Sequence, residues 1–92
     1  MAKIIKTTGE TIYVQPKNGT DFQLAELQAI VEGYIEIVRL DDQGTEMVVN
    51  EEGKFTCAYN SVATAVAHLC RAIPISDYVC GNVLVCNNNQ IK

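Results

Sequence analysis

Apolar and polar residues along the first part of the chain are arranged in a pattern that predicts two short strands. KIIKT (residues 3–7) and TIYVQP (residues 11–16) are rich in β-branched and aromatic residues, which favour strands. Gly9 lies between them and supplies the positive φ of a tight hairpin loop. Pro16 lacks the N–H that a strand ladder needs, so we expect the second strand to end there.

The next apolar residues follow a helical period. Thr20 and Gln23 have the spacing of a capping box, and Gly33 is typical of the residue after a helix. These signals predict a helix that begins at Thr20 and ends before Gly33. We expect its buried stripe to consist of Leu24, Leu27, Ile30 and Val31.

The clearest hairpin signal lies between Gly33 and Gly53. It consists of an apolar run (34–40), a DDQG turn (41–44) and a second run (45–50). In the second run the alternation places Met47 and Val49 toward the core, and Glu46 and Asn50 outward. Apolar residues of the first run fall on both faces. Either both faces are partly covered, or a bulge near residues 37–38 exchanges them.

The second half of the chain predicts one more helix and one more strand. We expect an extended connection over residues 54–59 and a helix from its cap, Asn60, to about Arg71, because Pro74 prevents its continuation. Residues 78–86 are apolar on both faces, which is typical of a central strand, and Gly81 indicates a bulge or a close backbone approach. The buried side of the helix is predicted to be Val62, Ala63, Val66, Leu69 and Cys70.

The order ββαββαβ predicts the α+β fold class. We expect a single domain over residues 1–86, with a mostly antiparallel sheet of about five strands and two helices packed on it. Residues 87–92 form a polar C-terminal tail that we expect to be frayed.

Composition and charge exclude several classes of function. The 92 residues carry a formal net charge of −4, and no basic patch of the kind that binds nucleic acid is present. No apolar run is long enough to span a bilayer, and the N-terminus lacks the apolar region of a secretory signal. We therefore expect a cytoplasmic protein that binds neither membranes nor nucleic acid directly.

The four cysteines do not predict a metal site or any other cofactor. Their spacings are 13, 10 and 6, without a C-x₂-C pair, and the chain has one histidine. We expect reduced, buried cysteines that pack as small hydrophobes; the alternative is two disulfides, which need an oxidising compartment. The four residues are Cys57, Cys70, Cys80 and Cys86.

The sequence shows no arrangement of residues typical of an enzyme, and we expect a protein without enzymatic activity. His68 falls on the solvent side of the second helix, and the carboxylate pairs 41–42 and 51–52 sit in turns, where acidic residues serve solvation. Glycines occur singly, so no phosphate-binding loop is present. One polar line remains on the second helix, and it either meets a ligand or is a solvated face: Asn60, Thr64, His68 and Arg71.

Four sequence blocks together resemble a known family. They are GYIEIV (33–38), MVVNEEG (47–53), N-x-x-A-T (60–64) and D-Y-V-x-G-x-V-L-V (77–85). The chain resembles, over nearly its whole length, a family of short domains of unknown function encoded by bacteriophages, plasmids and conjugative elements. Asn82 stands where that family often has aspartate. The resemblance implies a mobile-element setting and no assigned activity.

By analogy with other small phage proteins, the first hypothesis is a non-enzymatic, homo-oligomeric binding protein with a counter-defence role. It would sequester a small nucleotide-like ligand or occupy a host protein. We expect the site where the turn after the hairpin meets the second helix, with the residues Asn50, Glu51, Asn60, Thr64, His68 and Arg71.

Two alternatives belong to other classes. One is an acidic protein that mimics nucleic acid, as antirestriction factors do; it needs one exposed face formed by Asp21, Glu26, Glu32, Glu36 and Glu46. The other is a cryptic hydrolase that uses His68 with a turn carboxylate.

Overall fold

The computed structural model describes residues 2–91. The strands are β1 (Ala2–Ile5), β2 (Thr11–Val14), β3 (Ile35–Arg39), β4 (Thr45–Asn50) and β5 (Val83–Asn87). The helices are α1 (Leu24–Val31), the single-turn α2 (Gly53–Thr56), α3 (Ser61–Leu69) and a 3₁₀ turn, η1 (Asn88–Gln90). The strands form one antiparallel sheet in the order β2-β1-β5-β4-β3. The predicted α+β class and the ββαββαβ order are confirmed.

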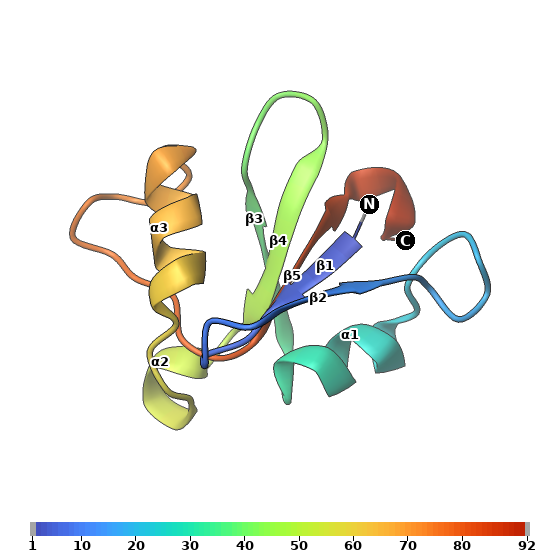
Figure 1. Cartoon of the computed structure of the whole chain (residues 1–92), viewed down its shortest axis with the longest axis horizontal. Helices are drawn as coiled ribbons and strands as arrows, with labels where there is room; N and C mark the ends of the chain where they lie inside the picture. The colour runs from blue at the N-terminus through green and yellow to red at the C-terminus, as the bar shows by residue number, and fades with distance from the viewer. Residues whose placement is uncertain (1, 92) are drawn as a thin grey trace.

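The two longer helices cover opposite faces of this sheet (Figure 1). Ala63 and Ala67 of α3 pack with Met47 and Val49 of β4 in one hydrophobic cluster. On the other face, Leu27 and Val31 of α1 pack with Val48 and Leu84. Strand β4 is therefore buried on both sides, and Asn50, predicted to point outward, is only 8% exposed.

Strand β5 lies in the middle of the sheet, as its two apolar faces predict. It begins at Val83, later than predicted, because Gly81 adopts a φ of +89° that turns the chain away from the ladder. A Cβ at position 81 would lie 3.2 Å from Cys57 Cβ, so the close backbone approach predicted for this glycine is confirmed.

Strand β3 resolves the alternative left open by its sequence. Its pairing with β4 runs without interruption from Ile35↔Asn50 to Arg39↔Glu46, so no bulge is present within the strand. Ile35 packs in the cluster under α1, and Val38 packs in the cluster under α3. Both faces of the strand are partly covered.

The cap of helix α1 lies three residues later than predicted, at Gln23 instead of Thr20. The Asn18 carboxamide oxygen accepts from the backbone N–H groups of Thr20 and Asp21, which fixes these residues in a turn. Gln23 is the cap, and its backbone N–H donates to Glu26 at 2.9 Å. Leu24, predicted to be buried, is 57% exposed because it falls in the first turn, beyond the packed part of the stripe.

Residues 53–56 form the helical turn α2, so the prediction of an extended connection was wrong there. The Asn50 side chain starts this turn by accepting from the Glu52 backbone N–H at 2.8 Å. The Thr56 hydroxyl donates to the Glu52 carbonyl at 3.2 Å, which holds the end of the turn. Propensity alone does not favour α2; the anchored Asn50 imposes it.

Helix α3 is turned about its axis relative to the prediction. Asn60 is its cap, as expected, and accepts from the Ala63 N–H at 2.9 Å. The face packed on the sheet, however, carries Ala63, Thr64 and Ala67, and Leu69 is 84% exposed. The buried polar groups of this face find backbone partners, as described below.

Residues 87–91 are bonded to the domain where we expected fraying, and Lys92 lies outside the described residues. Strand β5 continues to Asn87, and Asn87 caps η1 by accepting from the Asn89 N–H at 3.0 Å. Ile91 forms an isolated parallel bridge with Phe22, and its side chain packs against the cluster under α1. This one apolar residue of the polar tail fastens it to the domain.

Candidate functional site

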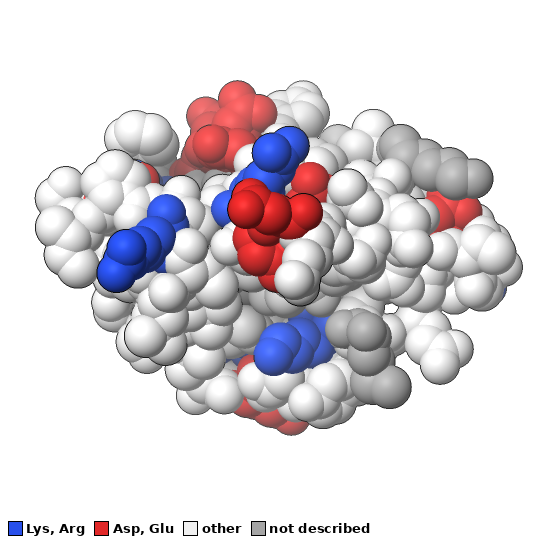
Figure 2. All heavy atoms as spheres, turned by 90° about the horizontal axis from the view of Figure 1, so that it is seen from above, with Lys and Arg blue, Asp and Glu red and all other residues white. Residues whose placement is uncertain are grey.

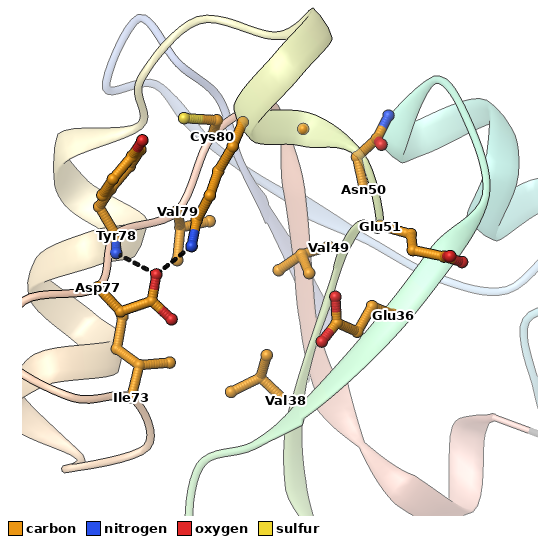
Figure 3. Close-up of a pocket in the computed structure, with 12 residues that line it drawn as sticks. Glu36, Val38, Val49, Asn50, Glu51, Ile73, Asp77, Tyr78, Val79 and Cys80 are labelled. Carbon is orange, nitrogen blue, oxygen red and sulfur yellow. Dashed lines mark hydrogen bonds and ion pairs between the residues drawn. The ribbon is translucent and has the colours of Figure 1, made fainter.

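A cleft of about 170 Å³ lies between the β3–β4 face and residues 73–80, beside α2. Val38, Val49 and Val79 give it an apolar lining. The charged residues that line it are Glu36, Glu51, Lys54 and Asp77, and Tyr78 lies next to the last of these. In Figure 3 the Glu36 carboxylate is turned toward the cleft, whereas the Glu51 carboxylate is turned away from it.

An ion pair spans the cleft wall. The Asp77 carboxylate accepts from Lys54 Nζ and from the Tyr78 backbone N–H (Figure 3). The bond from Lys54, followed by the one from Tyr78, lowers the pKa of Asp77. The same bond raises the pKa of Lys54, whose ammonium group also lies 4.9 Å from the centre of the Tyr78 ring. Both groups are charged at neutral pH, and they tie α2 to the segment after α3.

Three of the predicted site residues hold this segment in place. The Thr64 hydroxyl accepts from the Val79 N–H at 2.9 Å and lies 3.3 Å from the Val79 carbonyl. His68 Nε2 lies 2.8 Å from the Asp77 carbonyl oxygen. The Asn60 amide donates to the carbonyls of Ile5 and Gly81, and its side chain is fully buried. These three side chains hold the segment that forms the cleft wall, but they do not line the cleft themselves. A ligand contact for them stays a prediction.

Asn50 and Glu51 lie at the opposite wall. The Asn50 amide donates to the Val31 carbonyl at 3.0 Å, so this side chain joins β4 to the end of α1. Its Cβ side faces the cleft, and its amide faces away. Asn50 and Glu51 therefore line the same cleft as the segment held by Asn60, Thr64 and His68. That these residues together bind a ligand stays a prediction.

Arg71 lies apart from the other five predicted residues. It borders a separate, open hollow at the other end of α3, together with Arg39, Asp41 and Asp42. Its φ of +55° is the left-handed conformation that usually favours glycine at a helix end. The arginine therefore does not serve the cleft.

Four charged or aromatic residues that line the cleft were not among the predicted site residues: Glu36, Lys54, Asp77 and Tyr78. Lys54 and Asp77 are separated by 23 positions, and no periodic pattern connects them. The only local signal is position, because Lys54 directly follows the acidic turn and Asp77–Tyr78 opens the last of the four blocks.

The carboxylates that a nucleic-acid mimic would need do not share one face. Asp21 is 4% exposed. Glu36 pairs with Val49 on the α3 face, and Glu46 pairs with Cys86 on the α1 face. Figure 2 shows the acidic side chains on the face in view in several small groups, the central one directly beside a basic group.

Several further observations concern chemistry elsewhere in the fold. All four cysteines are free; Cys80 and Cys86 are buried as expected, whereas Cys70, predicted to be buried, is exposed because α3 is turned. Within residues 2–91, no three His, Cys, Asp or Glu side chains come together as metal ligands. No helix in that range is both long and apolar enough to cross a bilayer.

A comparison with protein families found one match. The model described as "Domain of unknown function (DUF3846)" matches residues 1–91. The chain belongs to the DUF3846 family. This confirms the predicted membership of a family of domains of unknown function over nearly the whole chain, and a DUF3846 domain carries no assigned activity. Comparisons with curated proteins and with solved structures found no match.

Proposed function

We propose that this DUF3846 domain is a non-enzymatic binding protein that acts by occupying another protein. We further propose that it is an accessory protein of a phage or other mobile element, that its partner is a host protein in the cytoplasm, and that its role is counter-defence. One observation carries the choice of a protein partner: exposed aromatic and aliphatic side chains collect around α2, α3 and the segment after α3.

Six of the ten large hydrophobic side chains exposed within residues 2–91 come from residues 55–78. Phe55 is 88% exposed, and the exposed rings of Tyr59 and Tyr78 lie with their centres 6.1 Å apart. We call Phe55, Tyr59 and Tyr78 the aromatic surface. Phe and Tyr are enriched in protein–protein interfaces. Truncation of a hot-spot residue in an interface to alanine costs about 2 kcal/mol or more of binding free energy. The other three residues are Val62, Leu69 and Ile75.

The cleft beside the aromatic surface is a poor match for a nucleotide-like ligand. Its volume of about 170 Å³ is below the roughly 300–1,000 Å³ of typical small-molecule sites. Its charged residues are Glu36, Glu51, Lys54 and Asp77; Lys54 is already paired with Asp77, and the Glu36 carboxylate, unlike that of Glu51, is turned into the cleft. Such a lining repels phosphate groups. A protein partner is therefore the better-supported form of the binding hypothesis.

The arrangement of polar groups gives no support to the other two hypotheses. His68 Nε2 lies 2.8 Å from the Asp77 backbone carbonyl, a contact that holds the segment after α3 and lends no support to a hydrolytic role for His68 with a turn carboxylate. The buried Asp21 and the opposite faces of Glu36 and Glu46 deny a nucleic-acid mimic its single acidic surface.

The test is affinity capture with the full chain as bait, from a lysate of the cell that carries the gene, with quantitative mass spectrometry. We expect Phe55→Ala combined with Tyr59→Ala to reduce recovery of the specific partner by about ten-fold or more. The matched control combines Tyr13→Ala with Leu24→Ala, two exposed side chains elsewhere on the fold, and should leave recovery unchanged.

The solution mass of the purified chain belongs to the same experiment, because we also expect a homo-oligomer. A second copy that covers the aromatic surface gives an oligomer that dissociates in the Phe55→Ala, Tyr59→Ala variant. A monomer whose captured proteins are the same in both double variants contradicts the proposal. Co-purification of a nucleotide, detected by mass spectrometry and by a thermal shift, contradicts it in favour of small-ligand sequestration.

A further inference from the structure

Strand β3 leaves one row of its backbone groups without a strand partner. It is an edge strand of the sheet. The Tyr34 carbonyl accepts from the Glu51 N–H, and the Leu40 N–H donates to the Thr45 carbonyl, so the even-numbered residues turn toward β4. Because these groups alternate along an antiparallel pair, the N–H and C=O groups of Ile35, Ile37 and Arg39 point outward, away from the sheet.

The cleft adjoins the same strand. Glu36 and Val38 of β3 line it, so their side chains project on the α3 face of the sheet. A chain added beside β3 would place every second side chain on this face, next to those two residues. Its other side chains would fall on the α1 face beside Ile37, which is 41% exposed. The edge therefore has a hydrogen-bonding row, a cleft on one face and an apolar contact on the other.

The charge of the cleft determines which kind of peptide segment fits beside β3. The Asp77 carboxylate is neutralised by Lys54, and none of the residues 2–91 forms an ion pair with Glu36. The Glu36 carboxylate is turned toward the cleft, whose wall is otherwise apolar at Val38 and Val49 (Figure 3). A Lys or Arg side chain matches both features, because its apolar stem packs on the valines while its charged head reaches the carboxylate.

We propose that β3 binds an extended basic segment of a protein partner as a sixth strand, with a Lys or Arg side chain beside Glu36. This mode of recognition is β-strand addition, in which backbone bonds supply affinity and the pockets beside the strand supply specificity. The inference deepens the proposed function, because it names the docking site and the chemistry of the partner segment.

A second copy of this chain is disfavoured as the occupant. Each copy carries a net charge of −4. A two-fold pairing of β3 with itself, centred on Ile37, would bring two Glu36 carboxylates onto one face of the joined sheet in neighbouring strands, where like charges repel. The acidic chain therefore favours a basic partner.

The test uses the capped peptide acetyl-Lys-Val-Lys-Val-Lys-Val-Lys-amide, titrated into the full chain and followed by the backbone amide signals in NMR. We expect the shifts to centre on residues 35–39. Ile37→Pro removes one outward N–H without removing a bond to β4, and should weaken binding by about ten-fold or more. The matched control is Tyr13→Pro on the other edge strand.

Position 13 is equivalent in geometry. The Lys6 N–H donates to the Glu10 carbonyl, so by the same alternation the Tyr13 N–H points away from β1. We expect Tyr13→Pro to bind the peptide as the wild type does. Equal binding by Ile37→Pro and the wild type would overturn the proposal, as would the lack of any shift in residues 35–39 at millimolar peptide.

A charge swap keeps the test independent of how well the proline variant folds. We expect Glu36→Lys to lose the lysine peptide and to bind the analogue with glutamate at the lysine positions. Glu46→Lys, on the opposite face, should retain the wild-type preference. Binding of both peptides by the wild type with equal affinity would overturn the proposal. So would a wild-type dimer that dissociates in Ile37→Pro, because it assigns the edge to a second copy.

The two proposals fail separately. Peptide binding at β3 without any partner sensitive to Phe55 and Tyr59 would remove the proposed aromatic surface and leave the edge site standing. A captured partner that depends on the aromatic surface but is insensitive to Ile37→Pro would support the proposed function and overturn the edge site.

Discussion

The Asn50 side-chain amide fills the space that any side chain at position 33 would need. A Cβ on Gly33 would lie 2.6 Å from Asn50 Nδ2, and that amide donates to the Val31 carbonyl at the end of α1. Gly33 does not have a positive φ, so its role is the close approach and not backbone freedom. One buried asparagine thus joins α1, β4 and the turn that begins α2.

This contact predicts that Gly33→Ala destabilises the domain. We expect a loss of about 1–3 kcal/mol in the free energy of unfolding, measured by urea denaturation, because the added methyl displaces a hydrogen-bonded amide in a packed site. Asn50→Ala removes the side chain that obstructs position 33, although this substitution by itself also lowers the free energy of unfolding. In that background Gly33→Ala should cost less than about 0.5 kcal/mol. Strict additivity of the two changes would show that the contact does not limit position 33.

Thr64 predicts a second effect, at the wall of the cleft. Its hydroxyl is buried and serves both the N–H and the carbonyl of Val79. Thr64→Val keeps the shape but leaves the Val79 N–H unsatisfied, whereas the Val79 carbonyl still accepts from the Asn60 N–H at 2.9 Å. We therefore expect a loss of about 1–3 kcal/mol. Thr64→Ser retains the hydroxyl and should lose less. Faster hydrogen exchange at residues 77–81 in Thr64→Val would confirm that the wall has loosened; unchanged exchange there would contradict the role assigned to Thr64.

The sequence predicted the features that depend on local chemistry. The hairpin over residues 34–50, the glycine in its turn and the cap at Asn60 all follow from neighbouring residues, and all are confirmed. The central position of β5 could also be predicted, because apolar residues on both faces of one strand need cover on both sides. The register of β3 on β4 is given by the structure, in which the pairing of the two strands is uninterrupted.

The orientation of α3 could not be predicted in this way. Apolar character placed Leu69 inside, yet the buried face consists of small residues with Asn60 and Thr64. These polar side chains are stable there only because the backbone of residues 79–81 supplies their hydrogen bonds, and that segment is distant in sequence. The cleft escaped prediction for the same reason, since its ion pair joins two segments that only the fold brings together.

The ion pair of Lys54 and Asp77 predicts a pH dependence of stability. The pKa of Asp77 is lowered in the folded state by its bonds to Lys54 and Tyr78. Its stabilising contribution is therefore fully present above the ordinary aspartate pKa of about 3.9, and is lost as the pH falls through the lowered value. We expect the wild type to exceed Asp77→Asn in urea midpoint at pH 7 and pH 5, and the difference to shrink near pH 3.

High salt is the control for that measurement. Both side chains are partly exposed to solvent, Lys54 by 45% and Asp77 by 34%, so 1 M NaCl should narrow the same difference in urea midpoint at pH 7 by screening. A difference that is independent of both pH and salt would mean that Asp77 acts through its bond to the Tyr78 backbone, which asparagine can also accept, and that the ion pair contributes nothing measurable.

Arg71 predicts a substitution that increases stability. It ends α3 with a φ of +55°, and the Ala72 N–H next to it donates to the Ala67 carbonyl at 2.9 Å, closing the last turn. A residue with a Cβ pays roughly 1 kcal/mol for this conformation, and glycine does not. We expect Arg71→Gly to raise the free energy of unfolding by about 1 kcal/mol. Ala65→Gly, in the exposed interior of the same helix, should lower the free energy of unfolding by about the same amount.

Arg71→Gly should also leave peptide binding at β3 unchanged, because Arg71 borders the hollow at the far end of α3 and not the cleft. Weaker peptide binding by Arg71→Gly would show that the two ends of α3 are coupled, and would return Arg71 to the site in which the sequence placed it.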